Sequence, residues 1–284
     1  MQRKKRRNHK TEQEEVEEVE EVEEVEVVEP LEEEEEEEEE KRRFGCFFIL
    51  GLILIFVGGG YLGIRYYSQY LSEKMYEEIA VVMKTSVEND VGFDFMVELA
   101  VDNPDLAGYI DLLDTPLSYP VVQTEKENGL YYMRRDFAER FSELGTPFAD
   151  YRTPLSKTTE HIIIYGHTGD VGDTMFAPLL DYKNANFFNT HQTVHLTTKE
   201  EIVPYRLLFA MTVPADDFIA GLWLETMDPH TRDGEEIIKR LQEASYNQIS
   251  DYVYNKADRF LTLVSCERNR NDERVIVVYE QTKF

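Results

Sequence analysis

The sequence predicts a mainly β domain of eight short strands, a closed barrel or a sandwich, that follows one membrane-spanning helix. Eight segments between residues 107 and 281 are rich in β-branched, aromatic and aliphatic residues and are separated by turn signals, a pattern typical of barrels and sandwiches. Residues 44–64 form a run of 21 residues without a charge, which is long enough to cross about 30 Å of hydrocarbon. With 284 residues, 42% of them hydrophobic, the chain can fill one or two cores.

The first 43 residues have the composition of a solvated cytoplasmic tail. Residues 1–10 hold six Lys or Arg, whereas residues 11–40 hold 20 glutamates and no basic residue. Val16, Val19, Val22 and Val25 recur at every third position, and this period builds no apolar stripe on a helix. Because runs of like charge repel one another, we expect disorder or a frayed helix in residues 12–40. The basic arm is expected to be a solvated, disordered tail, and contact with anionic lipid headgroups is its functional alternative.

Residues 44–64 are interpreted as an uncleaved signal anchor. A cleaved signal peptide starts nearer the N-terminus and ends at a site of small residues, and the sequence has neither feature. Lys41, Arg42 and Arg43 precede the segment, while Arg65 and Lys74 follow it. This distribution of basic residues favours a cytoplasmic N-terminus only weakly.

The chain beyond residue 43 is acidic and contains one thiol. It has 21 basic and 37 acidic residues, which argues against nucleic-acid binding because phosphate contacts need a basic face. Of the two cysteines, Cys46 lies in the apolar segment and Cys266 near the C-terminus. No disulfide is therefore expected within the folded part, and its stability must come from the core.

Helices are expected before the strands and between them. Residues 66–103 are predicted to be helical, with a second short helix over residues 93–101 that ends before Asn103-Pro104. An amphipathic stripe at spacings of three and four supports the first helix: it contains Tyr67, Tyr70, Leu71, Met75, Ile79, Val82 and Met83. Two further helices are predicted over residues 173–182 and residues 231–250. The predicted strands cover residues 107–113, 118–122, 146–149, 160–165, 193–198, 203–213, 259–265 and 274–281.

The last two predicted strands form a hairpin that contains Cys266. Residues 269–272 supply the turn chemistry between them. In an antiparallel pair the end of one strand faces the start of the next, so Cys266 and Arg274 should be neighbours. A guanidinium favours the thiolate and can hold a developing oxyanion. His167, at the exit of the strand over residues 160–165 and directly after Gly166, is the best proton carrier, and a Cys, a His and an Arg at strand ends are the parts of a thiol acyl-transfer enzyme.

Three collinear elements resemble the signature of sortases: Tyr165-Gly-His167, Thr262-Leu-Val-Ser-Cys266 and Arg274. Three upstream runs resemble class B in particular, and they are Asn103-Pro-Asp-Leu-Ala-Gly-Tyr-Ile110, Tyr119-Pro-Val-Val-Gln123 and Phe148-Ala-Asp-Tyr-Arg152. The match covers roughly residues 70–284. The chain departs from it at Val264-Ser265, where the family often has Ser-Thr.

The resemblance implies a fold and a division of the chain. Sortases have an eight-stranded barrel, and class B members have N-terminal helices and a long helix before the cysteine strand. We accordingly expect helices and a spacer over residues 65–104, and a catalytic barrel over residues 105–284 that lies outside the cell. The membrane is expected to hold the enzyme through residues 44–64.

The resemblance also implies an activity and its partners. A class B sortase cleaves a C-terminal sorting signal, such as Asn-Pro-x-Thr, of a secreted protein and joins the acyl group to a peptidoglycan amine. Cys266 would be the nucleophile, His167 the general acid and base, and Arg274 the oxyanion or substrate clamp. Glu267 and Ser265 are candidates for substrate contacts. The sequence suggests no metal or cofactor site, since Asp170, Asp173 and Asp181 lack the spacing of a ligand loop.

Three other functions stay open at this point. A pilin-polymerising sortase would use a lysine of another protein as the acceptor, and a thiol hydrolase would use water. A membrane-tethered scaffold without catalysis, whose acidic tail recruits a basic partner, belongs to a different class. The set of Cys266, His167 and Arg274 argues against the scaffold.

Overall fold

The computed structural model describes residues 30–89, 92–156, 158–168, 174–215, 230, 233–267 and 270–282, and of residues 30–40, 266, 267, 270 and 271 it describes the backbone alone. The chain divides into two units, Met1–Gly59 and Gly60–Phe284. The predicted basic arm and the valine repeat lie outside the described residues.

The described part of the first unit is helical. Helix α1, Pro30–Glu88, begins in the glutamate run and continues into the second unit. Of the two alternatives expected for the acidic tract, disorder or a frayed helix, the described part from Pro30 onward is helical. Glutamate has good helix propensity, and the run is continuous with the helix of the apolar segment. Among the described residues, one helix is long and apolar enough to cross a membrane, by length and composition, and it includes the predicted anchor.

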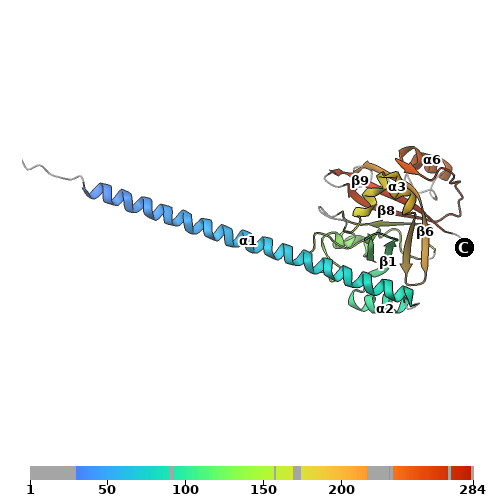
Figure 1. Cartoon of the computed structure of the whole chain (residues 1–284), viewed down its shortest axis with the longest axis horizontal. Coiled ribbons are helices and arrows are strands. Elements are labelled where there is room, and N and C mark those ends of the chain that lie inside the picture. The colour runs from blue at the N-terminus through green and yellow to red at the C-terminus, as the bar shows by residue number, and fades with distance from the viewer. Residues whose placement is uncertain are drawn as a thin grey trace, which may run out of the picture. The chain divides into compact units, whose positions relative to one another are not determined.

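Eight strands of the second unit close into a barrel (Figure 1), as the sequence predicted. The order around the ring is β5-β1-β2-β3-β4-β8-β9-β6, and a β5–β6 pairing closes it. A short ninth strand, β7 (Asn247–Gln248), is added at the edge of β6. The eight barrel strands are β1 (Leu106–Leu112), β2 (Ser118–Val122), β3 (Phe148–Ala149), β4 (His161–Tyr165), β5 (Thr193–Thr198), β6 (Ile202–Pro214), β8 (Phe260–Glu267) and β9 (Arg270–Gln281).

Each predicted strand corresponds to one barrel strand, and β2 and β5 have the predicted bounds. The largest difference lies in the last hairpin, where β9 begins at Arg270 and the predicted turn residues 270–272 belong to the strand. Only residues 268 and 269 separate β8 from β9. The sequence pattern did not predict this extension because the residues at the start of β9 are polar, and strand prediction depends on apolar alternation.

The helices between the strands are shorter than predicted. The segment predicted over residues 173–182 contains a 3₁₀ helix, η3 (Ala177–Lys183), and Asp173 lies outside the described residues. The predicted long helix is α6 (Gly234–Ala244), and it ends early because Asn247 and Gln248 pair with β6. The remaining helices among the described residues are α2 (Gly92–Asp102), close to the prediction, α3 (Ala185–Thr190), η1 (Lys126–Asn128) and η2 (Tyr131–Arg134).

The C-terminal part of α1 packs on the barrel with a face that overlaps the predicted stripe in part, since Met83 is buried and Met75 and Ile79 pack against the core. Ser72, Tyr76 and Met83 are buried, whereas Tyr67 and Tyr70 are more than half exposed. The Ser72 hydroxyl donates to the buried Asp136 carboxylate at 2.8 Å, and the Tyr76 hydroxyl donates to the Gly145 carbonyl at 2.7 Å. The prediction counted only apolar residues and therefore missed Ser72 and Tyr76, whose hydroxyl contacts are part of the buried face.

Alternate residues of the strands fill two cores. On β4, Ile162 and Ile164 belong to the larger cluster that includes the barrel interior, and Ile163 belongs to a second cluster with Ile237 and Leu241 of α6. This period of two is the ordinary pleat of a strand. Helix α6 therefore covers the outer face of β6, β8 and β9, while α2 lies at the opposite side of the barrel near β1 (Figure 1).

Candidate active site

Cys266 and Arg274 are direct partners in the antiparallel pair β8–β9. The register runs without interruption from Phe260↔Glu280 to Cys266↔Arg274, and it shifts only at the next residue of β8. This confirms the expected adjacency of the two positions. Arg274 is half-buried, its Nη1 donates to the Glu273 carbonyl at 2.9 Å, and on its other side it pairs with Val213 of β6.

His167 follows the strand that lies on the other side of β8. Strands β4 and β8 are parallel, with Tyr165 opposite Val264. One further hydrogen bond, from the Gly166 nitrogen to the Val264 carbonyl at 3.0 Å, continues the pairing beyond the end of β4. Two residues beyond Tyr165 and Val264 are His167 and Cys266, so the parallel register leads the half-buried His167 to the level of Cys266.

Gly166 is required by a close contact with Phe176. A Cβ atom at this position would lie 2.3 Å from the ring of Phe176, which is fully buried. The Phe176 nitrogen donates to the His167 carbonyl at 3.0 Å. The glycine therefore lets the chain after His167 fold back onto its own strand exit.

A pair of hydroxyls ties the histidine segment to the cysteine strand. Thr168 and Ser265, each adjacent to a candidate catalytic residue, are both buried and share a hydrogen bond. Ser265, which the sequence suggested for substrate contacts, thus has its hydroxyl directed to Thr168. Its role toward a substrate stays a prediction, as does that of Glu267, whose backbone alone is described at the end of β8.

The segment after His167 is also anchored by Tyr119, to which the sequence had pointed only as part of a family motif. Met175 pairs with Thr168 in an isolated bridge and has a left-handed backbone with φ 54°. Its nitrogen donates to the Tyr119 hydroxyl at 2.9 Å. The Tyr119 ring meets the ring of Tyr76 on α1 edge-on, with centroids 5.4 Å apart. Such a backbone conformation persists only where its surroundings hold it.

The sequence and the fold were compared with those of known proteins. No family model matches the chain. It is 27% identical to sortase B of Listeria monocytogenes over 232 residues, which cover 80% of this chain and 89% of that protein. It is 29% identical to sortase B of Staphylococcus aureus over 180 residues, 62% of this chain and 70% of that protein. The crystal structure of Clostridium perfringens sortase B matches with a TM-score of 0.58 and 27% identity, covering 66% of this chain and 98% of that one.

These similarities support a class B sortase. Sortases of this kind are cysteine transpeptidases, and both the fold and the sequence similarity extend over most of each relative. The resemblance seen in the sequence motifs is thereby confirmed, together with the mainly β barrel.

The other histidines of the sortase lie apart from this arrangement. His161 begins β4, is buried, and its Nε2 is 2.8 Å from the Thr262 hydroxyl. His195 lies on β5, opposite Asp111 of β1. His191 stacks on Phe187 with ring centroids 4.0 Å apart.

Tyr165, two residues before the candidate histidine His167, takes part in a charged network. Its hydroxyl donates to Asp150 at 2.7 Å, and Arg152 donates to both oxygens of the same carboxylate at 2.9 and 2.7 Å. Burial pushes the pKa of Asp150 upward, but the hydrogen bonds from Arg152 and Tyr165 outweigh it and leave this pKa below its ordinary value. Burial and the adjacent Asp150 raise the pKa of Tyr165, so its hydroxyl stays protonated. The sequence had pointed to residues 148–152 only as a family motif.

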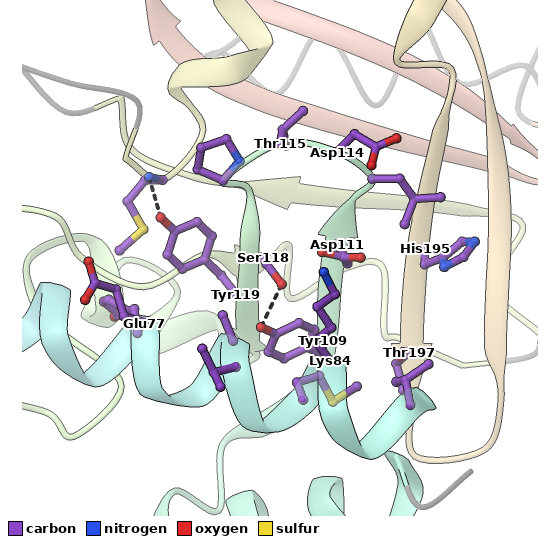
Figure 2. A pocket seen from close by; sticks show the side chains of 18 of the residues that line it. Glu77, Lys84, Tyr109, Asp111, Asp114, Thr115, Ser118, Tyr119, His195 and Thr197 are labelled. Atoms are coloured by element: carbon purple, nitrogen blue, oxygen red, sulfur yellow. Dashed lines mark hydrogen bonds between the residues drawn. The ribbon is translucent and has the colours of Figure 1, made fainter. Parts of the chain in front are cut away.

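A groove of about 1250 Å³ lies between α1 and strands β1, β2 and β5 (Figure 2). Tyr109 and Tyr119 lie side by side in it, and each hydroxyl is hydrogen-bonded, to Ser118 and to the Met175 nitrogen respectively. The groove contains none of Cys266, His167 and Arg274, but it reaches the histidine segment through Met175. Burial raises the pKa of Asp111 in this groove, against the opposing effect of Ser118, His195 and Lys84.

Proposed function

We propose that Cys266, His167 and Arg274 are the catalytic residues of this sortase. The proposal rests mainly on the strand register. Cys266 of β8 pairs directly with Arg274 of β9, and β4, the parallel neighbour of β8 on its other side, leads to His167. Cys46 and Cys266 are the only thiols of the chain, and Cys46 lies in the apolar segment. A thiolate beside a guanidinium, with an imidazole at the end of the neighbouring strand, is suited to acyl transfer.

The proposed reaction has two steps. The Cys266 sulfur attacks the carbonyl carbon of the scissile peptide bond, the carbon–nitrogen bond breaks, and His167 gives a proton to the leaving amine. An acceptor amine then attacks the thioester carbon, the carbon–sulfur bond breaks, and His167 takes the proton of that amine. Arg274 holds the oxygen that becomes negative in both tetrahedral intermediates.

The proposed donor substrate is a secreted protein with a C-terminal signal of the Asn-Pro-x-Thr kind, cleaved after Thr. The proposed acceptor is an amine of the cell-wall peptidoglycan. Both come from the family to which the chain is similar. A pilin lysine as acceptor is the second candidate, because it requires the same thioester and differs only in the amine that attacks it.

The proposed topology has residues 1–43 in the cytoplasm, residues 44–64 across the membrane in a single pass, and residues 65–284 outside the cell. Residues 65–104 would be the helical spacer and residues 105–284 the catalytic domain. The length and composition of α1 support the anchor. An outside position of the barrel agrees with a cell-wall acceptor.

The test incubates the full chain in detergent with fluorogenic peptides that contain Asn-Pro-x-Thr or a scrambled version of it. Mass spectrometry then identifies the product with and without added amines, among them a peptidoglycan fragment and a lysine-bearing peptide. We expect cleavage after Thr and transfer to an amine, and complete loss of both in Cys266→Ala. Activity of Cys266→Ala within tenfold of the wild type would refute the assignment of the nucleophile.

The acceptor experiment separates the two candidates. A product joined to the peptidoglycan fragment alone supports cell-wall anchoring, and a product joined to the lysine peptide alone supports polymerisation. Hydrolysis without any transfer would contradict both acceptors. Cys46→Ala is the matched control, and it should retain full activity because Cys46 lies in the apolar segment.

A further inference from the structure

The loops of the barrel domain first contact α1 directly after the apolar segment. The apolar run ends at Ile64, and Arg65 already forms an ion pair with Glu143. Four residues beyond Ile64, the Ser68 hydroxyl donates to the Phe141 carbonyl. The loop that contains Phe141 and Glu143 therefore lies beside the first turns of α1 beyond the predicted membrane segment.

The position of Phe141 relative to a membrane follows from helix geometry. An α-helix rises about 1.5 Å per residue, so Ser68 lies about 6 Å along the axis from Ile64. The polar layer on each side of a bilayer is about 5–8 Å thick, since about 30 Å of hydrocarbon lies within a total of about 40–45 Å. With Ile64 at the hydrocarbon boundary, Ser68 and the loop that it contacts fall within the headgroup layer.

The residues at this level have the chemistry of a membrane interface. Aromatic side chains are enriched where a protein meets the headgroups, and here four of them are more than half exposed. Their exposed fractions are 77% for Tyr66, 61% for Tyr67, 52% for Tyr70 and 54% for Phe141. An exposed phenylalanine and three exposed tyrosines within about one and a half helical turns would be unfavourable in water alone.

The charge of this region also differs from the rest of the domain. The chain beyond residue 43 has a large excess of acidic residues, which an anionic leaflet would repel. Arg65 and Arg134 both pair with the Oε1 atom of Glu143, Arg134 Nη1 at 3.7 Å, and both guanidiniums keep considerable exposure. The negative charge of Glu143 is thereby neutralised next to the membrane.

We propose that Tyr66, Tyr67, Tyr70, Arg134 and Phe141 form a membrane-docking collar that holds the catalytic unit against the lipid headgroups. The collar rests on the proposed membrane anchor and extends it. The anchor alone tethers the domain, whereas the collar sets its height and limits its tilt. It would thereby keep the active site at a constant distance from the membrane in which the substrate's own hydrophobic tail is held.

The experiment measures the depth of single tryptophans in the full chain, reconstituted into nanodiscs of phosphatidylcholine and phosphatidylglycerol with brominated acyl chains. Trp223 is replaced by Phe, and tryptophan is then introduced as Phe141→Trp, Tyr61→Trp or Val253→Trp. Tyr61 lies in the apolar segment and reports the anchor, while Val253 is 83% exposed on the loop after β7 and is the remote control. We expect bromine quenching of Tyr61→Trp and of Phe141→Trp, and at least fivefold less quenching of Val253→Trp.

The controls distinguish failure of the collar from failure of the anchor. If Tyr61→Trp is quenched but Phe141→Trp is quenched no more than Val253→Trp, the collar is overturned and the anchor stands. Absence of quenching at Tyr61→Trp would overturn the anchor and the collar together. A measurement on the wild-type chain covers the case in which the tryptophan variants do not fold. A lipid with a photoreactive headgroup should label the peptide that contains Phe141 and not the peptide that contains Val253. Equal labelling of both peptides would reject the collar.

Discussion

Cys266 and Arg274 face each other across the β8–β9 hairpin at the last position before its register shifts. The uninterrupted ladder up to this point determines the spacing of the two backbones, and the pairing resumes beyond the shift at Glu267 and Arg270. Arg274 is flanked by β8 on one side and by β6 on the other. A guanidinium whose backbone is paired on both sides is suited to hold a developing charge without reorganisation.

Arg274→Ala should therefore lower kcat strongly. An oxyanion donor is typically worth about 2.7–4 kcal/mol, or on the order of a hundred- to thousandfold in rate. Arg274→Lys should recover only part of this loss, because lysine retains the charge but lacks the planar fork. The measurement is steady-state kinetics on one fluorogenic peptide at fixed pH, with circular dichroism to verify the fold.

Arg268→Ala and Arg270→Ala are the matched controls, since both residues lie at the tip of the same hairpin in the sequence. Each should retain most of the activity. If either proved essential while Arg274 did not, the role assigned to the register would be wrong. A change in KM alone for Arg274→Ala would indicate a substrate-positioning residue that does not stabilise the transition state.

Tyr119 is expected to be a positioning residue for His167. In Tyr119→Phe the buried Met175 nitrogen loses its acceptor, and the left-handed backbone at Met175 loses one of the contacts that hold it. A hydrogen bond is worth about 0.5–1.5 kcal/mol, so we expect kcat to fall about tenfold, which corresponds to about 1.4 kcal/mol. KM for the peptide should change little.

Tyr109→Phe provides the control for this effect. Tyr109 lies in the same groove and is also buried, but its hydroxyl pairs with Ser118, whereas that of Tyr119 pairs with Met175. The two variants should have similar melting temperatures, and only Tyr119→Phe should have the reduced kcat. Equal kinetics for both variants would contradict a positioning role.

The Asp150 network should contribute stability that depends on pH. Asp150 is buried and accepts hydrogen bonds from Arg152 and Tyr165. Asp150→Asn should reduce the free energy of unfolding by about 1.5–3 kcal/mol at neutral pH, the usual range for hydrogen bonds to a charged group. Urea unfolding of the two proteins between pH 7 and pH 3 measures the difference.

The sign of the pH dependence follows from the direction of the shift. The pKa of Asp150 is lower in the folded protein than its ordinary value of 3.8. Its contribution is therefore fully present above pH 3.8 and is lost as the pH falls through the lower folded-state pKa. The stability difference between wild type and variant should be constant down to about pH 4 and shrink below it. Asp102→Asn, at the exposed end of α2, is the matched control for the loss of a carboxylate.

Deletion of residues 1–40 should leave peptide cleavage unchanged. In the proposed topology these residues are separated from the active site by the membrane. The measurement compares kcat/KM of the shortened and the full chain in the same nanodiscs, and retention of Lys41–Arg43 preserves the basic flank of the anchor. A loss greater than threefold in the shortened chain would require a different topology or a catalytic role for the acidic tail.

Local information in the sequence was sufficient for the strands and for one half of the active site. The alternation of apolar residues and the turn signals depend on neighbours a few positions apart, and they located all eight barrel strands. Cys266 and Arg274 belong to one hairpin, so their adjacency follows from antiparallel pairing over a short loop. The same local rules failed where a hydrogen-bonding partner was distant, as in the buried face of α1 and in the early end of α6.

The tertiary structure alone decided the contacts that join distant segments. The parallel pairing of β4 with β8, which leads His167 to the level of Cys266, connects residues about a hundred positions apart, and no local pattern specifies which parallel strand is the neighbour. The hydroxyl pair of Thr168 and Ser265 and the bond from Met175 to Tyr119 depend on that same closure of the barrel. The sequence by itself thus determined which residues form strands and which of them can carry out the chemistry. Their assembly into one site required the barrel, because closing a sheet selects one set of non-local partners through the packing of its core.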